Sequence, residues 1–463
     1  MTIAFDAIFI GTGQSGPFLA RRLSSAGKKV AIVERGLFGG TCVNTGCIPT
    51  KALVASAYAA HLASRAAEFG VTIGGPVGID MKRVKARKDE ISGASNHSVE
   101  SGLRNLPNCT VYRGHARFES PHEVSVGDQR LTADQLFINV GARAIVPSIP
   151  GLDQVSYLTN SSMMHVDFLP KHLVILGGSY VGLEFAQMYR RFGSQVTVIE
   201  HGSRLIPRED EDVSAAILDI LQREGIQVCL GSKCKSVAKQ GDDIIASLDG
   251  SGNTVSEVRG SHLLLAVGRR PNTDDLGLEK AGVAADSHGY IQVDDQLRTN
   301  VPGIWAMGDC NGKGGFTHTS YNDFEIVAAN LLDNDPRKVS DRIRTYGLFI
   351  DPPLARAGMN EAEARKTGRK ILIGKRLMTK VGRAVEKSET LGFMKVLIDA
   401  ESMRILGAAI LGTGGDEAIH CVLDVMYADK PYTVIQRAVH IHPTVSELIP
   451  TMLGELQPLG EAS

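Results

Sequence analysis

Residues 4–34 read AFDAIFIGTGQSGPFLARRLSSAGKKVAIVE, and this stretch decides the fold class. An apolar run from Ala4 to Ile10 ends at a glycine-rich turn, and a helix-like stretch follows as far as Ser25. A second strand is then predicted from Lys29 to Val33, closing on Glu34. Short apolar runs on either side of a helix-like segment are typical of a parallel βαβ unit. The N-terminal part of the chain is therefore predicted to be an α/β domain.

The same pattern occurs a second time. An apolar run from Leu173 to Leu176 ends at the turn GGSYVG, a helix-like stretch continues to Phe192, and a strand from Gln195 to Ile199 closes on Glu200. In both copies the acidic residue stands 23 positions after the first glycine of the turn. Two copies with matched strands and matched acidic residues predict two dinucleotide-binding units.

The glycine spacing has a chemical reason in such units. The first glycine makes the tight turn, the second lets a pyrophosphate approach the backbone, and the third lets helix and strand pack closely. The helix N-terminus then faces the phosphates. The second turn carries Ser179 at its middle position, which predicts a pyrophosphate slightly farther from the backbone. The glycines concerned are Gly11, Gly13 and Gly16 in the first turn, and Gly177 and Gly182 in the second.

The acidic residue of the second unit bears on the choice of nicotinamide nucleotide. A carboxylate at the end of the second strand accepts hydrogen bonds from ribose hydroxyls and repels a 2′-phosphate, so Glu200 favours NADH over NADPH. Arg204, four residues on, could reach a 2′-phosphate or be a solvated surface charge. NADH is therefore predicted, with NADPH as the alternative.

The composition narrows the class of partner. The chain has 463 residues, enough for about three domains. It carries 50 Lys and Arg against 51 Asp and Glu, so no net field favours nucleic acid or an anionic membrane. The N-terminus shows no basic region or small-residue cleavage site, which predicts a cytoplasmic protein. Small-molecule partners are expected.

Seven cysteines are an odd number, which argues for one special pair among isolated thiols. Residues 39–51 read GGTCVNTGCIPTK, with Cys42 and Cys47 five positions apart. Five helical steps of roughly 1.5 Å, with a net turn of about 140°, would hold the two thiols apart and mis-aimed for a disulfide. Either the thiols never meet or the backbone bends, and we favour a bend at Gly46, with a helix that begins beyond Pro49.

Together these motifs resemble the FAD-dependent pyridine nucleotide-disulfide oxidoreductases, which include dihydrolipoamide dehydrogenase, glutathione reductase and mercuric reductase. The resemblance covers essentially the whole chain, and three further motifs follow in the family's order: AVGRRPN (266–272), IWAMGD (304–309) and HPTVSE (442–447). It implies two Rossmann-like dinucleotide-binding domains and an α+β C-terminal dimerisation domain. The implied bounds are residues 1–150 with 272–343 for FAD, 151–271 for NAD(P), and 344–463 for dimerisation.

The resemblance also assigns cofactors. The first unit is expected to bind FAD, with Glu34 on its ribose and Asp309 on the ribityl chain, and the second is expected to bind NADH. Tyr180 resembles the ring that covers the empty nicotinamide pocket, although a core tyrosine is the plain alternative. Further residues expected to contact the cofactors are Gly40, Thr41, Lys51, Gly141 and Gly268.

By the same resemblance, hydride passes from NADH to the flavin and electrons pass on to a Cys42–Cys47 disulfide. Cys47 then faces the flavin and Cys42 attacks the substrate through a mixed disulfide. Lys51, one helical turn after Cys47, can place its charge on the same side, and Glu184 resembles its acidic partner. The plain alternatives are a surface lysine and a helix-surface glutamate.

A histidine and a glutamate near the C-terminus complete the expected site. In relatives, the equivalents of His442 and Glu447 reach the thiols from the other subunit, which implies a homodimer with a shared active site. Imidazole titrates in the range needed to deprotonate a thiol, and a carboxylate orients it. His440 could pair with His442 on a metal, but the HxHP pattern also occurs in dihydrolipoamide dehydrogenases, so no metal is predicted.

The electron acceptor is the least specified part. Mercuric reductases carry an adjacent cysteine pair near the C-terminus and lack the histidine, unlike this chain. PRED (207–210) and DPPLARAGMNEAEAR (351–365) look most like the mercuric-reductase-like branch that includes the reactive-chlorine-resistance, copper-reducing flavoprotein. A small disulfide or soft metal ion is therefore expected as substrate.

Four alternatives stay open: dihydrolipoamide dehydrogenase, glutathione reductase, a flavin redox sensor and an NADH oxidase. Cys310 directly follows Asp309 and is either a third thiol near the flavin or an inert core residue. We favour the core residue.

Overall fold

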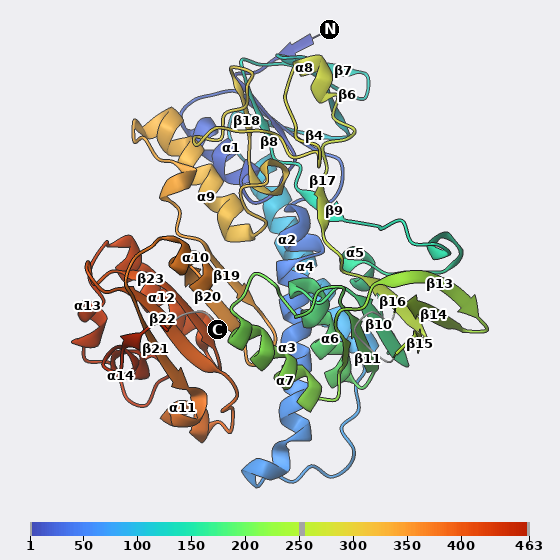
Figure 1. Ribbon diagram of the computed structural model, residues 1–463. Helices are drawn as coiled ribbons and strands as arrows, with labels where there is room; N and C mark the ends of the chain where they lie inside the picture. Colours follow the sequence, from blue (N-terminus) through green and yellow to red (C-terminus); the bar gives the residue numbers. More distant parts are fainter. Residues whose placement is uncertain (1, 250–254, 461–463) are drawn as a thin grey trace.

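The computed structural model describes residues 2–249 and 255–460, and Figure 1 shows them arranged in three parts. The first part, at the top, is built on a five-stranded parallel sheet of order β18-β8-β2-β3-β4. Helix α1 (Gly16–Ser25) connects the central strand β2 to its neighbour β3. The strands are β2 (Ala7–Ile10), β3 (Val30–Glu34), β4 (Cys109–Arg113), β8 (Gln135–Ile138) and β18 (Ile304–Ala306).

The apolar run at the N-terminus forms two strands where the sequence predicted one. β1 (Thr2–Ala4) pairs in parallel with β7 (Gln129–Thr132) in a separate four-stranded sheet, and only β2 enters the central sheet. Between them the Asp6 carboxylate accepts a hydrogen bond from the Lys29 backbone N–H at 2.7 Å. The chain passes from one sheet to the other at this polar residue.

The second part repeats the βαβ unit. Its parallel sheet has the order β12-β11-β10-β16, and α6 (Tyr180–Phe192) connects β10 to β11 as predicted. An antiparallel three-stranded sheet and α7 (Glu211–Arg223) complete it. The strands are β10 (His172–Leu176), β11 (Gln195–Ile199), β12 (Gln227–Cys229), β13 (Cys234–Gln240), β14 (Asp243–Leu248), β15 (Glu257–Gly260) and β16 (His262–Leu265).

The third part is a six-stranded antiparallel sheet of order β19-β20-β23-β22-β21-β24. Its two central strands are buried along their whole length, which explains why they read as near-continuous apolar runs. Helices α10 (Glu361–Lys366), α12 (Gly415–Tyr427), α13 (Thr433–Gln436) and α14 (Leu448–Leu453) accompany the sheet. Its strands are β19 (Thr345–Leu348), β20 (Leu354–Gly358), β21 (Ile371–Leu377), β22 (Phe393–Asp399), β23 (Ile405–Leu411) and β24 (Gln457–Pro458).

Two long helices tie the three parts together. α3 (Cys47–Ser64) starts beside the first part and runs down the middle of the molecule, and α4 (Met81–Arg104) runs back up beside it and leads into β4 of the first sheet (Figure 1). The short helix α2 (Gly40–Asn44) precedes α3. The predicted class, two Rossmann-like units with an α+β C-terminal domain, is confirmed, whereas the residue bounds of the domains stay a prediction. Within the described ranges, no helix is both long and apolar enough to cross a bilayer.

Candidate active site

A cavity of about 840 Å³ lies where the three parts meet. The first part contributes the glycine-rich turn and both cysteines, the second contributes Tyr180 and Glu184, and the third contributes the strand β19 and part of α12. Of the residues predicted from the sequence, the cavity is lined by Gly11, Gly13, Glu34, Gly40, Thr41, Cys42, Cys47, Lys51, Gly141, Tyr180, Glu184 and Asp309.

The first glycine turn is shaped by Asn139, which directly follows β8. A Cβ on Gly11, whose φ is +98°, would lie 2.3 Å from the Asn139 backbone oxygen, and a Cβ on Gly13 would lie 2.7 Å from its side-chain Oδ1. That same Oδ1 accepts a hydrogen bond from the Gly16 N–H at 3.0 Å. A Cβ on Gly16 would lie 2.9 Å from the Gly11 backbone oxygen, so close approach requires glycine at all three positions.

The two acidic residues that end the βαβ units are held in matching ways. The Glu34 carboxylate accepts hydrogen bonds from the Thr12 N–H at 3.0 Å and the Gly36 N–H at 2.7 Å. Glu200 accepts from the N–H groups of Gly178 and Gly202, both at 2.7 Å. Because backbone donors hold both carboxylates in place, each is suited to accept further hydrogen bonds from a ribose.

The second turn is as tightly packed as the first, although its glycines do not line the main cavity. A Cβ on Gly177 would lie 2.3 Å from the Ala266 backbone oxygen, and a Cβ on Gly182 would lie 2.1 Å from the Gly177 oxygen. Gly268, with φ +126°, lies two residues after Ala266, in the loop that follows β16. Ser179 forms the N-cap position of α6, so the departure from glycine falls where serine is favoured.

Arg204 is engaged on the surface. Its guanidinium donates to the Pro207 backbone oxygen at 3.0 Å and lies 3.3 Å from the Glu211 carboxylate. This position agrees with the interpretation of Arg204 as a solvated surface charge.

The predicted bend between the two cysteines is present. α2 ends at Asn44 and α3 begins at Cys47, and Gly46 between them has φ −134° and ψ −118°, outside the helical range. A Cβ on Gly46 would lie 2.9 Å from the Thr41 backbone oxygen. The prediction that the helix begins beyond Pro49 is wrong, because the helix begins two residues earlier and Pro49 occupies its first turn, where a missing N–H costs nothing.

Both thiols are free, and they differ sharply in acidity. A hydrogen bond from Cys42, with help from Thr317 and the charge of Lys51, lowers the pKa of the Cys47 thiol to about 6 against the effect of burial. Hydrogen bonding to Cys47, followed by burial, raises the pKa of the Cys42 thiol. Cys47 Sγ lies 3.0 Å from Thr317 Oγ1, at the start of α9 (Thr317–Ala328). The negative charge of the reduced pair therefore belongs on Cys47, beside two helix N-termini.

Lys51 and Glu184 form an ion pair across the domain junction. The Lys51 ammonium lies 2.7 Å from Glu184 Oε2 and 4.5 Å from the centre of the Phe349 ring. Only 8% of the Glu184 side chain is exposed, and its Oε1 also accepts the Phe349 N–H at 3.0 Å. The structure thus brings together the lysine, the acid and the thiols that the sequence predicted as neighbours.

Several residues that line the cavity were missed from the sequence, among them Arg269 and Asn139. Arg269 donates to the Ala142 backbone oxygen at 2.6 Å and lies 3.2 Å from the Asp309 carboxylate. Asn139 supports the first glycine turn. Arg269 lies inside the motif AVGRRPN, so its signal was present, whereas Asn139 had only its position after a buried strand.

His442 and Glu447 form a pair outside this cavity. His442 Nδ1 lies 2.9 Å from Glu447 Oε2, and 79% of the histidine side chain is exposed. Neither residue lines the cavity of its own chain. Val439 and Ile441 beside them are among the most exposed large apolar side chains of the described chain. The pair is therefore presented outward on an apolar surface.

Cys310 is fully buried, and burial raises the pKa of its thiol to about 12. Its Sγ contacts the Met307 backbone oxygen at 3.3 Å inside the core of the first part. This agrees with the interpretation of Cys310 as an inert core residue.

The residues present fit an FAD. The cavity brings together the first glycine-rich turn, the Glu34 carboxylate in a position suited to a ribose, the acid Asp309 and the two thiols. Gly40, with φ +62°, approaches the Gly13 Cα so closely that a Cβ would lie 3.0 Å away. Backbone N–H groups and small residues in such a cradle suit a pyrophosphate.

Comparison with known proteins gives the same result. Residues 5–323 match the family described as pyridine nucleotide-disulphide oxidoreductase, and residues 345–453 match its dimerisation domain. The chain is 35% identical over 451 residues to the probable pyridine nucleotide-disulfide oxidoreductase RclA of Escherichia coli, covering 96% of this chain and 97% of the relative. It is 34% identical to a mercuric reductase of Streptomyces lividans, covering 96% and 94%.

Among solved structures, the Cu(II) complex of the HOCl-induced flavoprotein disulfide reductase RclA from Escherichia coli superposes with a TM-score of 0.89. That similarity covers 97% of this chain and 100% of the other, at 34% identity. The resemblance inferred from the motifs is confirmed, together with the use of FAD and NAD(P)H. The chain belongs to the FAD-dependent pyridine nucleotide-disulfide oxidoreductase family, in the branch of RclA and mercuric reductase.

Proposed function

We propose that this flavoprotein disulfide reductase takes electrons from NADH and delivers them, through Cys42 and Cys47, to a small disulfide or a soft metal ion. The observation that carries the proposal is the unequal pair of thiols in the cavity, with the acidic thiol held next to Lys51. Bound FAD supplies two-electron transfer between the nicotinamide and sulfur. The role of each side chain follows from its place in the cavity.

The two cysteines divide the work. Cys47 holds the thiolate of the reduced pair, since the hydrogen bond from Cys42 and the charge of Lys51 stabilise it. Cys42, once deprotonated, attacks a disulfide acceptor and forms a mixed disulfide, while the first acceptor thiolate leaves. The Cys47 thiolate then attacks the Cys42 sulfur, which restores the internal disulfide and releases the second acceptor thiolate. Two electrons leave the pair in each cycle.

The raised pKa of Cys42 creates a need for a base. We assign this role to His442 of a second subunit, oriented by Glu447. The dimerisation domain indicates a homodimer, and the outward-facing His442–Glu447 pair on an apolar surface supports a site shared between subunits. A second support is that neither residue lines the cavity of its own chain.

The acceptor class follows from the thiols and the similar proteins. Thiolates bind soft metal ions well, and the relatives include a mercuric reductase and a flavoprotein disulfide reductase whose structure was solved with Cu(II). Glu200, with its surface-engaged neighbour Arg204, supports NADH as the electron donor. Tyr180 is assigned as the ring over the nicotinamide pocket, and a cytoplasmic location, where disulfides are kept reduced, is part of the proposal.

A steady-state panel tests the proposal. Lipoamide, glutathione disulfide, Cu(II), Hg(II) and oxygen are each offered with NADH and with NADPH. We expect turnover of a disulfide or a metal ion that is lost in Cys42→Ser and kept in Cys234→Ser. Cys234 is the matched control because it lies on β13 and does not line the cavity; its thiol donates to the Ser236 backbone oxygen at 3.5 Å. Turnover that survives Cys42→Ser would overturn the proposal, and strong turnover of lipoamide alone would favour dihydrolipoamide dehydrogenase, one of the alternatives, over a mercuric-reductase-like enzyme.

A further inference from the structure

Two sequence motifs that pointed to the same branch meet in the structure. PRED (207–210) precedes α7 in the second part, and residues 351–365 run through β20 and α10 in the third. The Arg356 guanidinium from the second motif donates to Glu209 Oε2 through two nitrogens, at 2.8 and 2.6 Å, and to the Asp210 carboxylate at 2.8 Å. Each motif therefore supplies the partners of the other.

These charges are completely enclosed. The side chains of Arg356 and Glu209 are 1% and 0% exposed. Removing one member of such a pair would leave an uncompensated buried charge, so the pair holds the two parts together in one arrangement. The two donors to Oε2 also fix the direction of the Glu209 carboxylate and leave Oε1 to a different partner.

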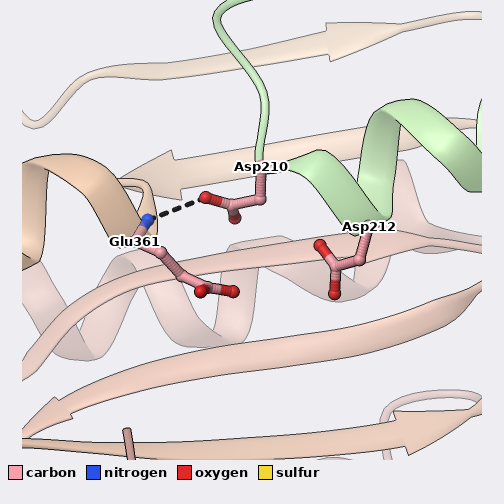
Figure 2. Close-up of side chains that lie close together, drawn as sticks. All are labelled: Asp210, Asp212 and Glu361. Carbon is pink, nitrogen blue, oxygen red and sulfur yellow. Dashed lines mark hydrogen bonds between the residues drawn. The ribbon is translucent and has the colours of Figure 1, made fainter. Parts of the chain in front are cut away.

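Three carboxylates continue this network away from the cavity. Figure 2 shows Asp210, Asp212 and Glu361 close together, with the Glu361 N–H donating to Asp210 at 2.8 Å. The Lys395 ammonium lies between 2.7 and 2.8 Å from all three carboxylates. A lysine side chain thus takes the cation position of this cluster.

The other end of the network reaches the cavity. The Tyr346 hydroxyl donates to Glu209 Oε1 at 2.6 Å. The Tyr346 ring stacks on Phe316 with the ring centres 5.7 Å apart, and it meets the Tyr180 ring edge-on at 5.6 Å. Tyr180 also meets Phe316 edge-on, at 5.9 Å. All three rings line the cavity.

From this chain of contacts we infer that Tyr346 is a positioning residue, anchored by Glu209 and Arg356, that holds the Tyr180 ring in the place it occupies without nucleotide. The inference rests on the proposed function, in which Tyr180 covers the nicotinamide pocket. A nicotinamide that enters must displace Tyr180 from its contacts with Tyr346 and Phe316. Because Tyr346 is hydrogen-bonded to a fully buried ion pair, it forms a fixed wall, and the stability of the covered state depends on that wall.

Tyr346→Phe is the most direct test, because it removes the anchoring hydroxyl and keeps the ring. Without its anchor, the ring at position 346 supports Tyr180 less well, so the population of the covered state falls. A nucleotide then spends less free energy on displacing Tyr180. We expect NAD⁺ to bind the oxidised FAD-loaded dimer about three- to tenfold more tightly, the range that corresponds to loosening one aromatic pair. Isothermal titration calorimetry measures this without turnover. We also expect faster consumption of oxygen with NADH, since the cavity is covered less of the time.

Two further variants separate anchoring from general stability. Glu361→Gln alters the same network but lies on α10, where its carboxylate contacts Lys395 and not Tyr346. It should lower the melting temperature and leave the dissociation constant for NAD⁺ unchanged. Glu209→Gln keeps an oxygen for the Tyr346 hydroxyl but weakens the hold of Arg356, so it should shift NAD⁺ binding in the same direction as Tyr346→Phe by a smaller factor.

If folded, FAD-loaded Tyr346→Phe binds NAD⁺ more weakly than the wild type, or equally tightly, the inference about Tyr346 is overturned and the proposed function is not. An equal shift in Glu361→Gln would also overturn the inference, because the effect would then report loss of stability. Wild-type protein that binds FAD but neither binds NAD⁺ nor is reduced by NADH would instead overturn the proposed function.

Discussion

The Lys51 ammonium lies 2.7 Å from Glu184 Oε2, and this ion pair joins the helix that carries Cys47 to the first helix of the second nucleotide unit. The positive charge of Lys51 acts on the thiols, and the nearly buried Glu184 carboxylate depends on the same charge as its partner. This one ion pair therefore affects both the acidity of the thiols and the packing between the domains.

Lys51→Met should affect both. Glu184 would keep the Phe349 N–H as a partner and lose its charged one, so we expect a loss of about 1–3 kcal/mol in the free energy of unfolding. The pKa of Cys47 should rise, because the charge of Lys51 is among the causes that lower it. Chemical denaturation and thiolate absorbance against pH measure the two effects. Lys82→Met, at an exposed position on α4, is the control and should change neither.

The reduced enzyme should carry one thiolate at neutral pH, and this thiolate should titrate near pH 6. The pKa of Cys47 is lower in the folded protein than its ordinary value, so this group stabilises the reduced fold at high pH. That contribution falls away as the pH drops through about 6. Cys42 has a raised pKa, so its own contribution is lost above the ordinary thiol range. Ultraviolet absorbance of the thiolate, with Cys47→Ser as control, measures the titration. A first titration near the ordinary thiol value would contradict the assignment.

Active-site sharing can be tested by mixing inactive subunits. His442→Ala and Cys47→Ser homodimers should each be inactive toward the acceptor. After unfolding and joint refolding, mixed dimers contain one site with both native residues, and statistical assembly predicts about a quarter of the wild-type activity. Acceptor turnover measures the recovery. If no activity returns while size-exclusion chromatography and mass spectrometry show mixed dimers, His442 serves its own chain or has no catalytic role.

Gly46→Ala should disturb the approach of the two thiols. The added Cβ would lie 2.9 Å from the Thr41 backbone oxygen, so the link between α2 and α3 must shift. We expect a loss of about 1–3 kcal/mol in the free energy of unfolding and slower formation of the Cys42–Cys47 disulfide. Thiol counting after reoxidation follows the second effect. Gly75→Ala is the matched control, because a Cβ there meets nothing within 4 Å.

Glu200→Gln should weaken the preference for NADH. The carboxylate accepts two backbone N–H groups at 2.7 Å, and the amide can accept through only one atom and repels a 2′-phosphate less. We expect kcat/KM for NADH to fall about tenfold, with a smaller change or a gain for NADPH. Steady-state kinetics with NADH and with NADPH measure the two values of kcat/KM. An equal loss with both would show that Glu200 supports the turn without reading the ribose.

Much of this arrangement could be predicted from local sequence. The strands and helices of both βαβ units follow from apolar runs and glycine spacing; β11 has the predicted bounds, and α6 ends at the predicted residue but begins at Tyr180, inside the glycine turn. The division of the first apolar run into β1 and β2 could not be predicted, because it depends on pairing with β7, more than a hundred residues away. The start of the cysteine helix was misjudged because proline tolerates several positions in a first turn.

The site was predictable where residues sit inside motifs and less so where they act as support. Asn139 follows a strand without any surrounding pattern, and its role appears only when three glycines pack around it. The contact between Glu209 and Arg356 joins residues that are 147 positions apart. Both motifs could be recognised in the sequence, but the reason for them could not. The reason is that Glu209 and Arg356 neutralise each other's charge inside the protein.

The strand β18 has a consequence for how the molecule is made. The central sheet of the first domain takes this strand from residues 304–306, after the whole second nucleotide unit has been synthesised. On the ribosome, the second unit has all its own strands before the first domain has its last one. Asp309 and the start of α9 follow directly, so the lining of the cavity is completed late in translation. A nascent chain released before β18 emerges would hold a complete second βαβ unit beside an unfinished first domain.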